Sequence, residues 1–294
     1  MAGTYHTPVL LNEVLNFFRP GLEKKYIDAT FGFGGHSNAI AEKGGTVLGI
    51  EADGAEMGVV GKTTAVNPSV TLAEGNFRDI GRIAKENGFL SVAGILFDLG
   101  LSSWQLEMSE RGFSFQRNEP LDMRLNGKSG VTAADLVNGL YENELAELFN
   151  KFGQEPRARR FARVIAQRRQ IEPFRSAVDL AGVVEKASGT GRGRIHPATR
   201  VFQALRIAVN QELENISTAL PQALELLGSG GRLAVISFHS LEDRIVKLAF
   251  KEWSGRFGDG VRILTPKPIV PGSAEISRNP RSRSAKLRVM ERII

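Results

Sequence analysis

The amino-acid sequence predicts an α/β protein with a doubly wound sheet of seven strands and an inserted helical subdomain. Apolar strand patterns alternate with helical patterns over residues 26–98, which is typical of parallel strands joined by right-handed crossovers. Residues 105–200 show capped helices and no convincing strand pattern, and strand patterns return after residue 231. A chain of 294 residues has room for one domain that carries such an insert.

The first half of the predicted sheet comes from four apolar runs separated by helical patterns. The run from Val92 to Phe97 is apolar throughout, so we expect a strand buried on both faces. The expected strands are 26–30, 46–51, 70–75 and 92–98, and the expected helices between them are 36–43, 53–66 and 78–87.

Capping signals divide the predicted insert into helices. Thr132 with Asp135 begins one helix, and Ser176 with Asp179 caps another. A helix over 142–152 stops at Gly153, Pro156 opens the next, and the Gly/Arg-rich segment 189–194 is expected to be a loop. We therefore expect a discontinuous sheet domain of residues 1–104 and 201–294, with a helical domain of residues 105–200 that recognises RNA.

The remaining elements complete the sheet. A long helical pattern over 198–227 ends at the glycines of 228–231, and an apolar run over 233–238 is the fifth strand. A helix over 241–252 follows. Two further strand patterns, 261–264 and 286–292, are expected to form an antiparallel edge pair.

Composition limits the class of protein. There is no cysteine, so disulfides and cysteine-ligated zinc or iron–sulfur sites are excluded. No secretory signal or run of membrane-spanning length is apparent, and a cytoplasmic location is expected. The net charge of +6 favours a polyanionic partner, although a modest charge also serves solubility alone.

A glycine-dense turn after the first strand predicts a nucleoside-containing cofactor. Gly32, Gly34 and Gly35 stand between the strand and a helix, and Glu51 ends the next strand. Glycines let a ligand approach the backbone, and an acid about 20 residues later fits ribose hydroxyls. The spacing lacks the longer loop of dinucleotide binders, which favours a ligand without phosphates, such as S-adenosylmethionine. An ordinary strand-to-helix turn is the alternative.

Other candidate residues follow the carboxyl ends of strands. Asp98 leaves the fourth strand toward Ser102, and it suits either ligand contact or helix capping. Phe77 could cover an adenine face, although a lone Phe is more often part of a core. His36 stands at the mouth of the glycine turn, and His239 could orient a base or move a proton. A Ser–His–Asp hydrolase is disfavoured because the chain has no Gly-x-Ser-x-Gly elbow.

Arginines cluster in windows that contain few acids. Arg159, Arg160 and Arg163 share one helical face, which suits bidentate contact with phosphates. The alternative is a solvated helix face. Further basic residues stand in and after the insert and near the C-terminus: Arg192, Arg194, Arg200, Arg206, Arg278, Arg281, Arg283, Lys286 and Arg288.

Several blocks, in order along nearly the whole chain, closely resemble the RsmH (MraW) family of ribosomal RNA small-subunit methyltransferases. These blocks are far more specific together than any single glycine turn. They are HTPVLL (6–11), DATFGFGGHS (28–37), DLGLSS (98–103), RGFSF (111–115), PLDMR (120–124), HPATR (196–200), FQALRI (202–207), SFHSLEDR (237–244) and NPRSRS (279–284).

The resemblance implies a class I, Rossmann-like methyltransferase that uses S-adenosylmethionine to methylate N4 of one cytidine in the decoding region of small-subunit (16S) ribosomal RNA. No metal-binding residues and no membrane partner are expected, and a homodimer is an option. This chain has Glu51 where the family usually has Asp. The cofactor positions of the family fall on Gly34, Gly35, His36, Glu51, Phe77, Asp98 and Gln105.

No catalytic base is assured by the sequence, because the Asp/Asn-Pro-Pro-aromatic motif of amino methyltransferases is missing. The nearest candidates for a proton acceptor are Asp98, Ser102 and Ser103, with His239 second. Alternative functions are a methyltransferase of the same fold acting on DNA or protein, a nucleotide-dependent dehydrogenase, and a non-catalytic RNA-binding assembly protein.

Overall fold

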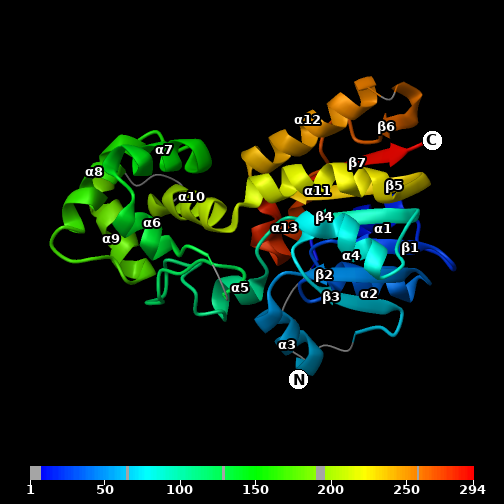
Figure 1. Ribbon diagram of the computed structural model, residues 1–294, viewed down its shortest axis with the longest axis horizontal. Coiled ribbons are helices and arrows are strands. Elements are labelled where there is room, and N and C mark those ends of the chain that lie inside the picture. The colour runs from blue at the N-terminus through cyan, green and yellow to red at the C-terminus, as the bar shows by residue number, and fades with distance from the viewer. Residues whose placement is uncertain (1–7, 64–65, 128–129, 190–195, 257) are drawn as a thin grey trace. The chain divides into compact units, whose positions relative to one another are not determined.

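The computed structural model describes residues 8–63, 66–127, 130–189, 196–256 and 258–294 (Figure 1). The chain forms two compact units. The sheet unit runs up to Ser102 and resumes at Leu213, and the helical unit comprises Ser103–Glu212.

The helical unit extends further along the sequence than the boundary at residue 200 that we expected. Its last helix, α10 (Ala198–Asn210), belongs to this unit because it packs closely against α7 (Glu142–Gly153). A Cβ atom added at Gly153 would lie 2.4 Å from the carbonyl oxygen of Arg200, so glycine permits the close approach. The single helix predicted over 198–227 is wrong, because Gln211 has a φ of 51° and separates α10 from α11 (Glu212–Leu226).

The strands form one mixed sheet of seven strands in the order β3-β2-β1-β4-β5-β7-β6, which confirms the predicted α/β class. The first five strands in this order are parallel, and β7 is antiparallel to both of its neighbours. The strands are β1 (Lys25–Asp28), β2 (Thr46–Glu51), β3 (Val70–Glu74), β4 (Val92–Asp98), β5 (Leu227–Ser237), β6 (Val261–Ile263) and β7 (Lys286–Arg292). The fifth strand begins earlier than predicted, at Leu227, and it includes the glycines of 228–231 that were expected to end a helix.

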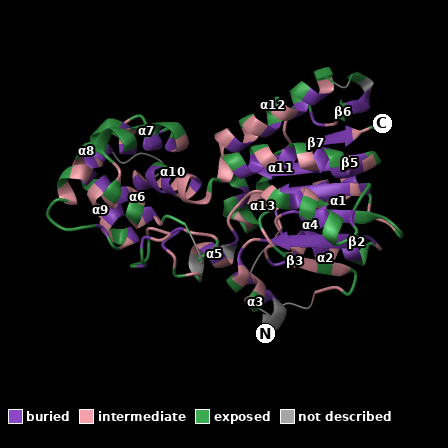
Figure 2. Cartoon of the chain, in the orientation of Figure 1, coloured by how far each residue is buried: buried purple, intermediate pink, exposed green. Residues whose placement is uncertain are grey.

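Helices cover both faces of the sheet because both faces are apolar. Successive residues of β1 point to opposite sides, so Tyr26 and Ile27 belong to different core clusters. Figure 2 shows the strands as largely buried between the helices of this unit. These helices are α1 (Leu11–Phe18), α2 (Gly35–Glu42), α3 (Gly54–Thr63), η1 (Phe77–Asp79), α4 (Ile80–Glu86), α11, α12 (Ser240–Arg256), η2 (Gly258–Gly260), α13 (Ser273–Arg278) and η3 (Pro280–Ser284).

Two helices of the helical unit, α6 and α9, begin where their capping residues predict. Thr132 and Asp135 form a reciprocal capping box, and the Ser176 hydroxyl accepts a hydrogen bond from the amide of Asp179, as predicted. The remaining helices of this unit are α5 (Ser103–Glu107), α6 (Ala133–Gly139), α8 (Ala158–Arg168) and α9 (Ala177–Ser188).

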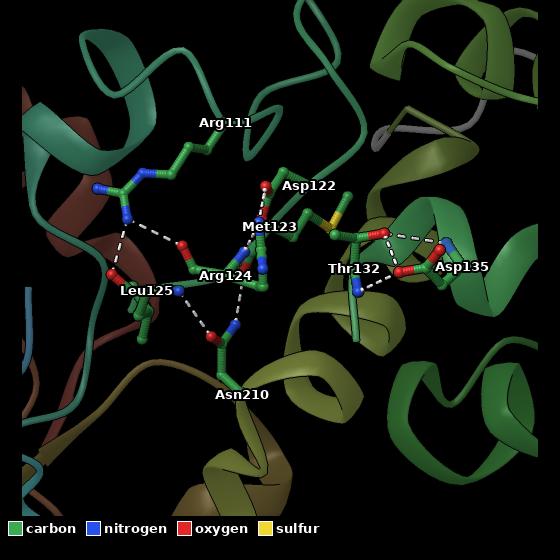
Figure 3. A network of polar contacts seen from close by, with 8 residues as sticks. All are labelled: Arg111, Asp122, Met123, Arg124, Leu125, Thr132, Asp135 and Asn210. Carbon is green, nitrogen blue, oxygen red and sulfur yellow. Dashed lines mark hydrogen bonds and ion pairs between the residues drawn. The ribbon is translucent and has the colours of Figure 1, made fainter. Parts of the chain in front are cut away.

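A polar network fixes the long loop that precedes α6 (Figure 3). One guanidinium nitrogen of Arg111 donates to the carbonyl oxygens of Arg124 (2.9 Å) and Leu125 (2.7 Å). The side chain of Asn210, at the end of α10, accepts from the amide of Leu125 and donates to the carbonyl of Met123, each at 2.8 Å. The loop backbone is therefore held from two sides by side chains of the same unit.

No helix among the described residues has both the length and the apolar character that crossing a membrane requires.

Candidate functional site

The strand order brings three sequence candidates to one edge of the sheet. The glycine turn follows β1, Glu51 ends β2 and Asp98 ends β4. Because β1 lies between β2 and β4 and all three are parallel, their carboxyl ends share the edge at which ligands bind in such sheets.

The glycine turn is shaped by steric necessity. Gly34 has a φ of 73°, caps α2, and donates its amide hydrogen to the carbonyl of Phe31 at 2.8 Å. A Cβ atom at Gly34 would lie 2.5 Å from the ring of Phe31, and one at Gly35 would lie 3.1 Å from Pro8. Only glycine fits both positions without displacing neighbours, so the glycines let the turn pack tightly against Phe31 and Pro8 at the start of α2.

Glu51 is buried and held by the turn itself. Its two carboxylate oxygens accept from the backbone amides of Gly32 and Asp53, each at 2.9 Å. Burial raises the pKa of Glu51 to about 7, although the two amides oppose the shift. The carboxylate is thus fixed beside the glycine turn, where the ribose contact was predicted.

Asp98 is held by a hydrogen bond of its backbone amide, and its carboxyl group is buried. Its amide donates to the hydroxyl of Thr30 at 2.7 Å, which joins the end of β4 to the end of β1. Among the described residues, its buried Oδ1 atom has no hydrogen-bond partner. The pKa of Asp98 is raised from 3.8 to about 8, first by burial and then by the carboxyl groups of Asp28 and Glu242.

Asp28 and Ser37 join this edge, and neither was predicted as a site residue. The Ser37 hydroxyl donates to Oδ2 of Asp28 at 2.7 Å, and burial raises the pKa of Asp28 to about 6. The available signal was the position of Asp28 at the end of the first strand, directly before the glycine turn.

The two histidine candidates differ in their partners. The Nδ1 atom of His36 lies 3.7 Å from Oδ2 of Asp98, which places His36 at the candidate site. His239 instead pairs with Glu242, whose Oε1 lies 3.2 Å from its Nε2 atom. The other oxygen of Glu242 accepts from the amides of Phe238 and His239 at the start of α12. Glu242 therefore acts as a cap at the helix start and fixes His239 after β5.

The remaining cofactor candidates have mixed outcomes. Phe77 follows β3 and packs edge-to-face on Phe97, with ring centroids 5.6 Å apart, so one side of its ring is core. Ser102 is buried at the end of the sheet unit, and the side chain of Ser103 lies outside the described residues. Gln105 lies on α5 of the helical unit, and its contact with a cofactor stays a prediction.

The predicted RNA-binding arginines differ in their exposure and in their contacts. Arg159, Arg160 and Arg163 are exposed on α8, and Phe161 and Ile165 are buried on its other side. Arg163 forms one solvent-exposed ion pair with Glu142, at 3.7 Å. Arg200 is exposed and donates to the carbonyl of Gln154 at 3.2 Å. Arg192 and Arg194 lie outside the described residues.

The residues at the sheet edge fit an adenosyl cofactor that carries a positive charge. The first backbone amides of α2 follow the tight turn at Gly34, and Glu51 presents a fixed carboxylate beside that turn. The buried Oδ1 of Asp98 is an acceptor that remains available among the described residues. Gly34, Gly35, Glu51 and Asp98 would hold the cofactor, and His36 would support Asp98.

A family model and two named relatives agree on the family that this chain matches. A model of the MraW methylase family matches residues 3–293. A Thermomicrobium roseum protein named Ribosomal RNA small subunit methyltransferase H is 50% identical over 307 residues, covering 99% of this chain and 94% of that protein. A Heliobacterium modesticaldum protein of the same name is 44% identical, covering 98% of this chain and 99% of that protein. A solved putative rRNA-methylase from Clostridium thermocellum is more distant, with 11% identity, a TM-score of 0.47, and coverage of 98% of this chain and 100% of that chain.

Proposed function

This chain belongs to the MraW methylase family, and we propose that it methylates N4 of one cytidine in the decoding region of 16S ribosomal RNA. It is a methyltransferase with a class I, Rossmann-like sheet, and S-adenosylmethionine is the methyl donor of the family. Ribosomal RNA of the small subunit, alone or assembled, is the proposed partner, and the cytoplasm is the proposed location.

The single observation that carries the site assignment is the convergence of Asp98 and Glu51 on the glycine turn. Asp98 is tied to Thr30 through its backbone, and Glu51 is tied to Gly32. Two buried carboxyl groups beside a glycine turn suit the hydroxyls and the positive charge of an adenosyl sulfonium.

The cofactor supplies an already activated methyl group, so the protein mainly has to align the acceptor amine. Cytosine N4 is a poor nucleophile because its lone pair is conjugated with the ring. A hydrogen-bond acceptor near that amine would orient it and receive the proton that it loses after transfer. Asp98 is the first candidate for this acceptor, because its Oδ1 is buried and has no hydrogen-bond partner among the described residues. Ser102 and His239 are the alternatives.

The target base must leave its stack to reach the sheet edge, or folded RNA must present it already unstacked. We propose that the exposed arginines of α8, together with Arg200, contact phosphates of this RNA. The helical unit is the proposed RNA-recognition domain, and Arg192 and Arg194 belong to the same proposal.

The proposed reaction is tested by methyl transfer from labelled S-adenosylmethionine to small subunits isolated from a strain that lacks this gene. Nucleoside mapping should then locate the label at N4 of a single cytidine. Label on protein or DNA, or no transfer despite RNA binding, would contradict the proposal and favour one of the alternative functions.

The role of Asp98 is tested separately with Asp98→Ala and calorimetry. Lost cofactor binding would assign Asp98 to the cofactor. Normal cofactor affinity with lost turnover would assign it to the amine. The matched variant Asp243→Ala removes an acid whose contacts are ion pairs to Lys286 and Arg288, so it reports the effect of removing a structural carboxylate.

A further inference from the structure

A second basic segment lies at the ligand-binding edge of the sheet unit itself. Strand β7 runs antiparallel to β5, and its first residue, Lys286, is paired with Ser237, the last residue of β5. The elements just before β7, α13 and η3, therefore lead into the edge at which β1, β2 and β4 end. This placement follows from the strand register within one unit.

Contacts divide the basic residues of this segment into two groups. Lys286 and Arg288 form ion pairs with Asp243 at 3.2 and 2.6 Å, and Arg288 is buried. Arg278, Arg281 and Arg283 are exposed. Among the described residues, no carboxylate forms an ion pair with Arg278 or Arg283, and the stretch from Ile276 to Arg288 contains no Asp or Glu.

The segment that carries the exposed arginines is anchored. Ser282 is fully buried, and its amide and hydroxyl both donate to the carbonyl of Asn279, at 3.0 and 2.8 Å. Glu275 accepts from the amide of Leu10 at 2.9 Å, which ties α13 to the start of α1. The arginines are thus presented from a fixed backbone, which lowers the entropy lost when they bind a ligand.

We propose that Arg278, Arg281 and Arg283 form a phosphate-binding surface that holds the RNA backbone next to the target nucleotide. This inference rests on the proposed function. The planar guanidinium fork of arginine matches phosphate oxygens. Arg278 and Arg283 form no ion pair with a carboxylate among the described residues, so they keep their full attraction for a polyanion. RNA bound there has its backbone at the edge where Asp98 and Glu51 stand.

The test compares Arg278→Gln/Arg283→Gln with Lys24→Gln/Lys251→Gln. Both double variants remove two exposed positive charges from the sheet unit, but Lys24 lies just before β1, at the opposite edge. Affinity for a single-stranded RNA of the decoding region is measured from 50 to 300 mM salt, together with cofactor affinity. A further variant, Arg278→Lys/Arg283→Lys, keeps the charge and loses the fork.

The arginine variant is expected to bind RNA about tenfold more weakly at 0.1 M salt and to lose about 1.4 from the log–log salt slope. The Lys24→Gln/Lys251→Gln control should keep the salt slope of the wild type. Both this control and the Arg278→Gln/Arg283→Gln variant should bind the cofactor normally. If the Arg278→Gln/Arg283→Gln variant has the same salt slope as the control, the inference is overturned. The proposed function still stands in that case, provided that the wild type methylates RNA. Binding to vesicles of anionic lipid is measured in parallel. If the arginine variant loses vesicle binding but keeps RNA binding, the surface belongs to a membrane contact and the inference is also overturned. A wild-type chain that neither binds nor methylates RNA refutes the proposed function, and this inference with it.

Discussion

The Nδ1 atom of His36 faces the Oδ2 atom of Asp98 at 3.7 Å, and the Nε2 atom of the same ring lies 3.0 Å from the carbonyl oxygen of Val9. A carbonyl oxygen only accepts, so Nε2 carries a hydrogen. In the neutral ring, Nδ1 then presents its lone pair toward Asp98. A proton on Asp98 or on Nδ1 of His36 makes the contact between these two groups favourable. A neutral His36 beside an ionised Asp98 would instead bring a lone pair toward a negative charge.

The stability of the cofactor-free protein should fall as pH rises from about 4 to about 8. The pKa of Asp98 is raised from 3.8 to about 8, so over this interval the folded protein keeps a proton that the unfolded chain has released. The same sign applies to Asp28 and Glu51, whose pKa values are raised to about 6 and about 7. Stability from these groups is fully present below their unfolded pKa values and is lost as pH passes the folded ones.

Urea unfolding at pH 5.5 and 8.5 measures this loss for the wild type and for Asp98→Asn. The amide cannot ionise, so the variant should lose less stability between the two pH values, by on the order of 3 kcal/mol. Parallel losses in both proteins would show that Asp98 is ionised at both pH values and would contradict the prediction.

Binding of S-adenosylmethionine should release protons near neutral pH. The positive sulfonium favours the ionised form of a neighbouring carboxyl group, and the raised pKa of Asp98 leaves it largely protonated beforehand. Affinity should therefore rise between pH 6 and 8. Calorimetry in two buffers of different ionisation enthalpy measures the number of protons released. S-adenosylhomocysteine lacks the positive charge and is the matched ligand, for which fewer protons are expected.

Gly34→Ala should weaken cofactor binding at least tenfold and destabilise the sheet unit by roughly 1–3 kcal/mol. The φ of 73° at Gly34 disfavours a Cβ atom, and that atom would lie 2.5 Å from the ring of Phe31. Gly58→Ala is the control. Gly58 lies in α3 with nothing within 4 Å of an added Cβ, so this change should stabilise the protein by about 0.5–1 kcal/mol. Thermal unfolding and cofactor titration of both variants check the difference.

Replacing Arg159, Arg160 and Arg163 with Gln should weaken RNA binding and lower its salt dependence by about 2 in the log–log slope. All three are exposed on α8, whose apolar side is buried, so folding of the helical unit should be unaffected. Lys186→Gln, exposed on α9, reports the effect of removing an unrelated charge. If the triple variant has the slope of the wild type, α8 does not contact phosphates.

Local sequence determined most of the elements, because hydrophobic period and capping chemistry act over a few residues. The strands ending at Glu51 and Asp98 and the capping box at Thr132 have the predicted positions. Helices α1 and α13 were not predicted. The break at Gln211 was also missed, because no glycine or proline marks it and a left-handed φ at glutamine is decided by packing.

The glycine turn, Glu51 and Asp98 could be selected from the sequence because each stands at a strand end next to residues that permit a ligand. The sequence could not show that Asp28 and Glu242 raise the pKa of Asp98, or that Thr30 holds its backbone. Those relations join separate strands and helices. Only the tertiary structure decides them, since burial and the distance between charges depend on which elements become neighbours in the sheet.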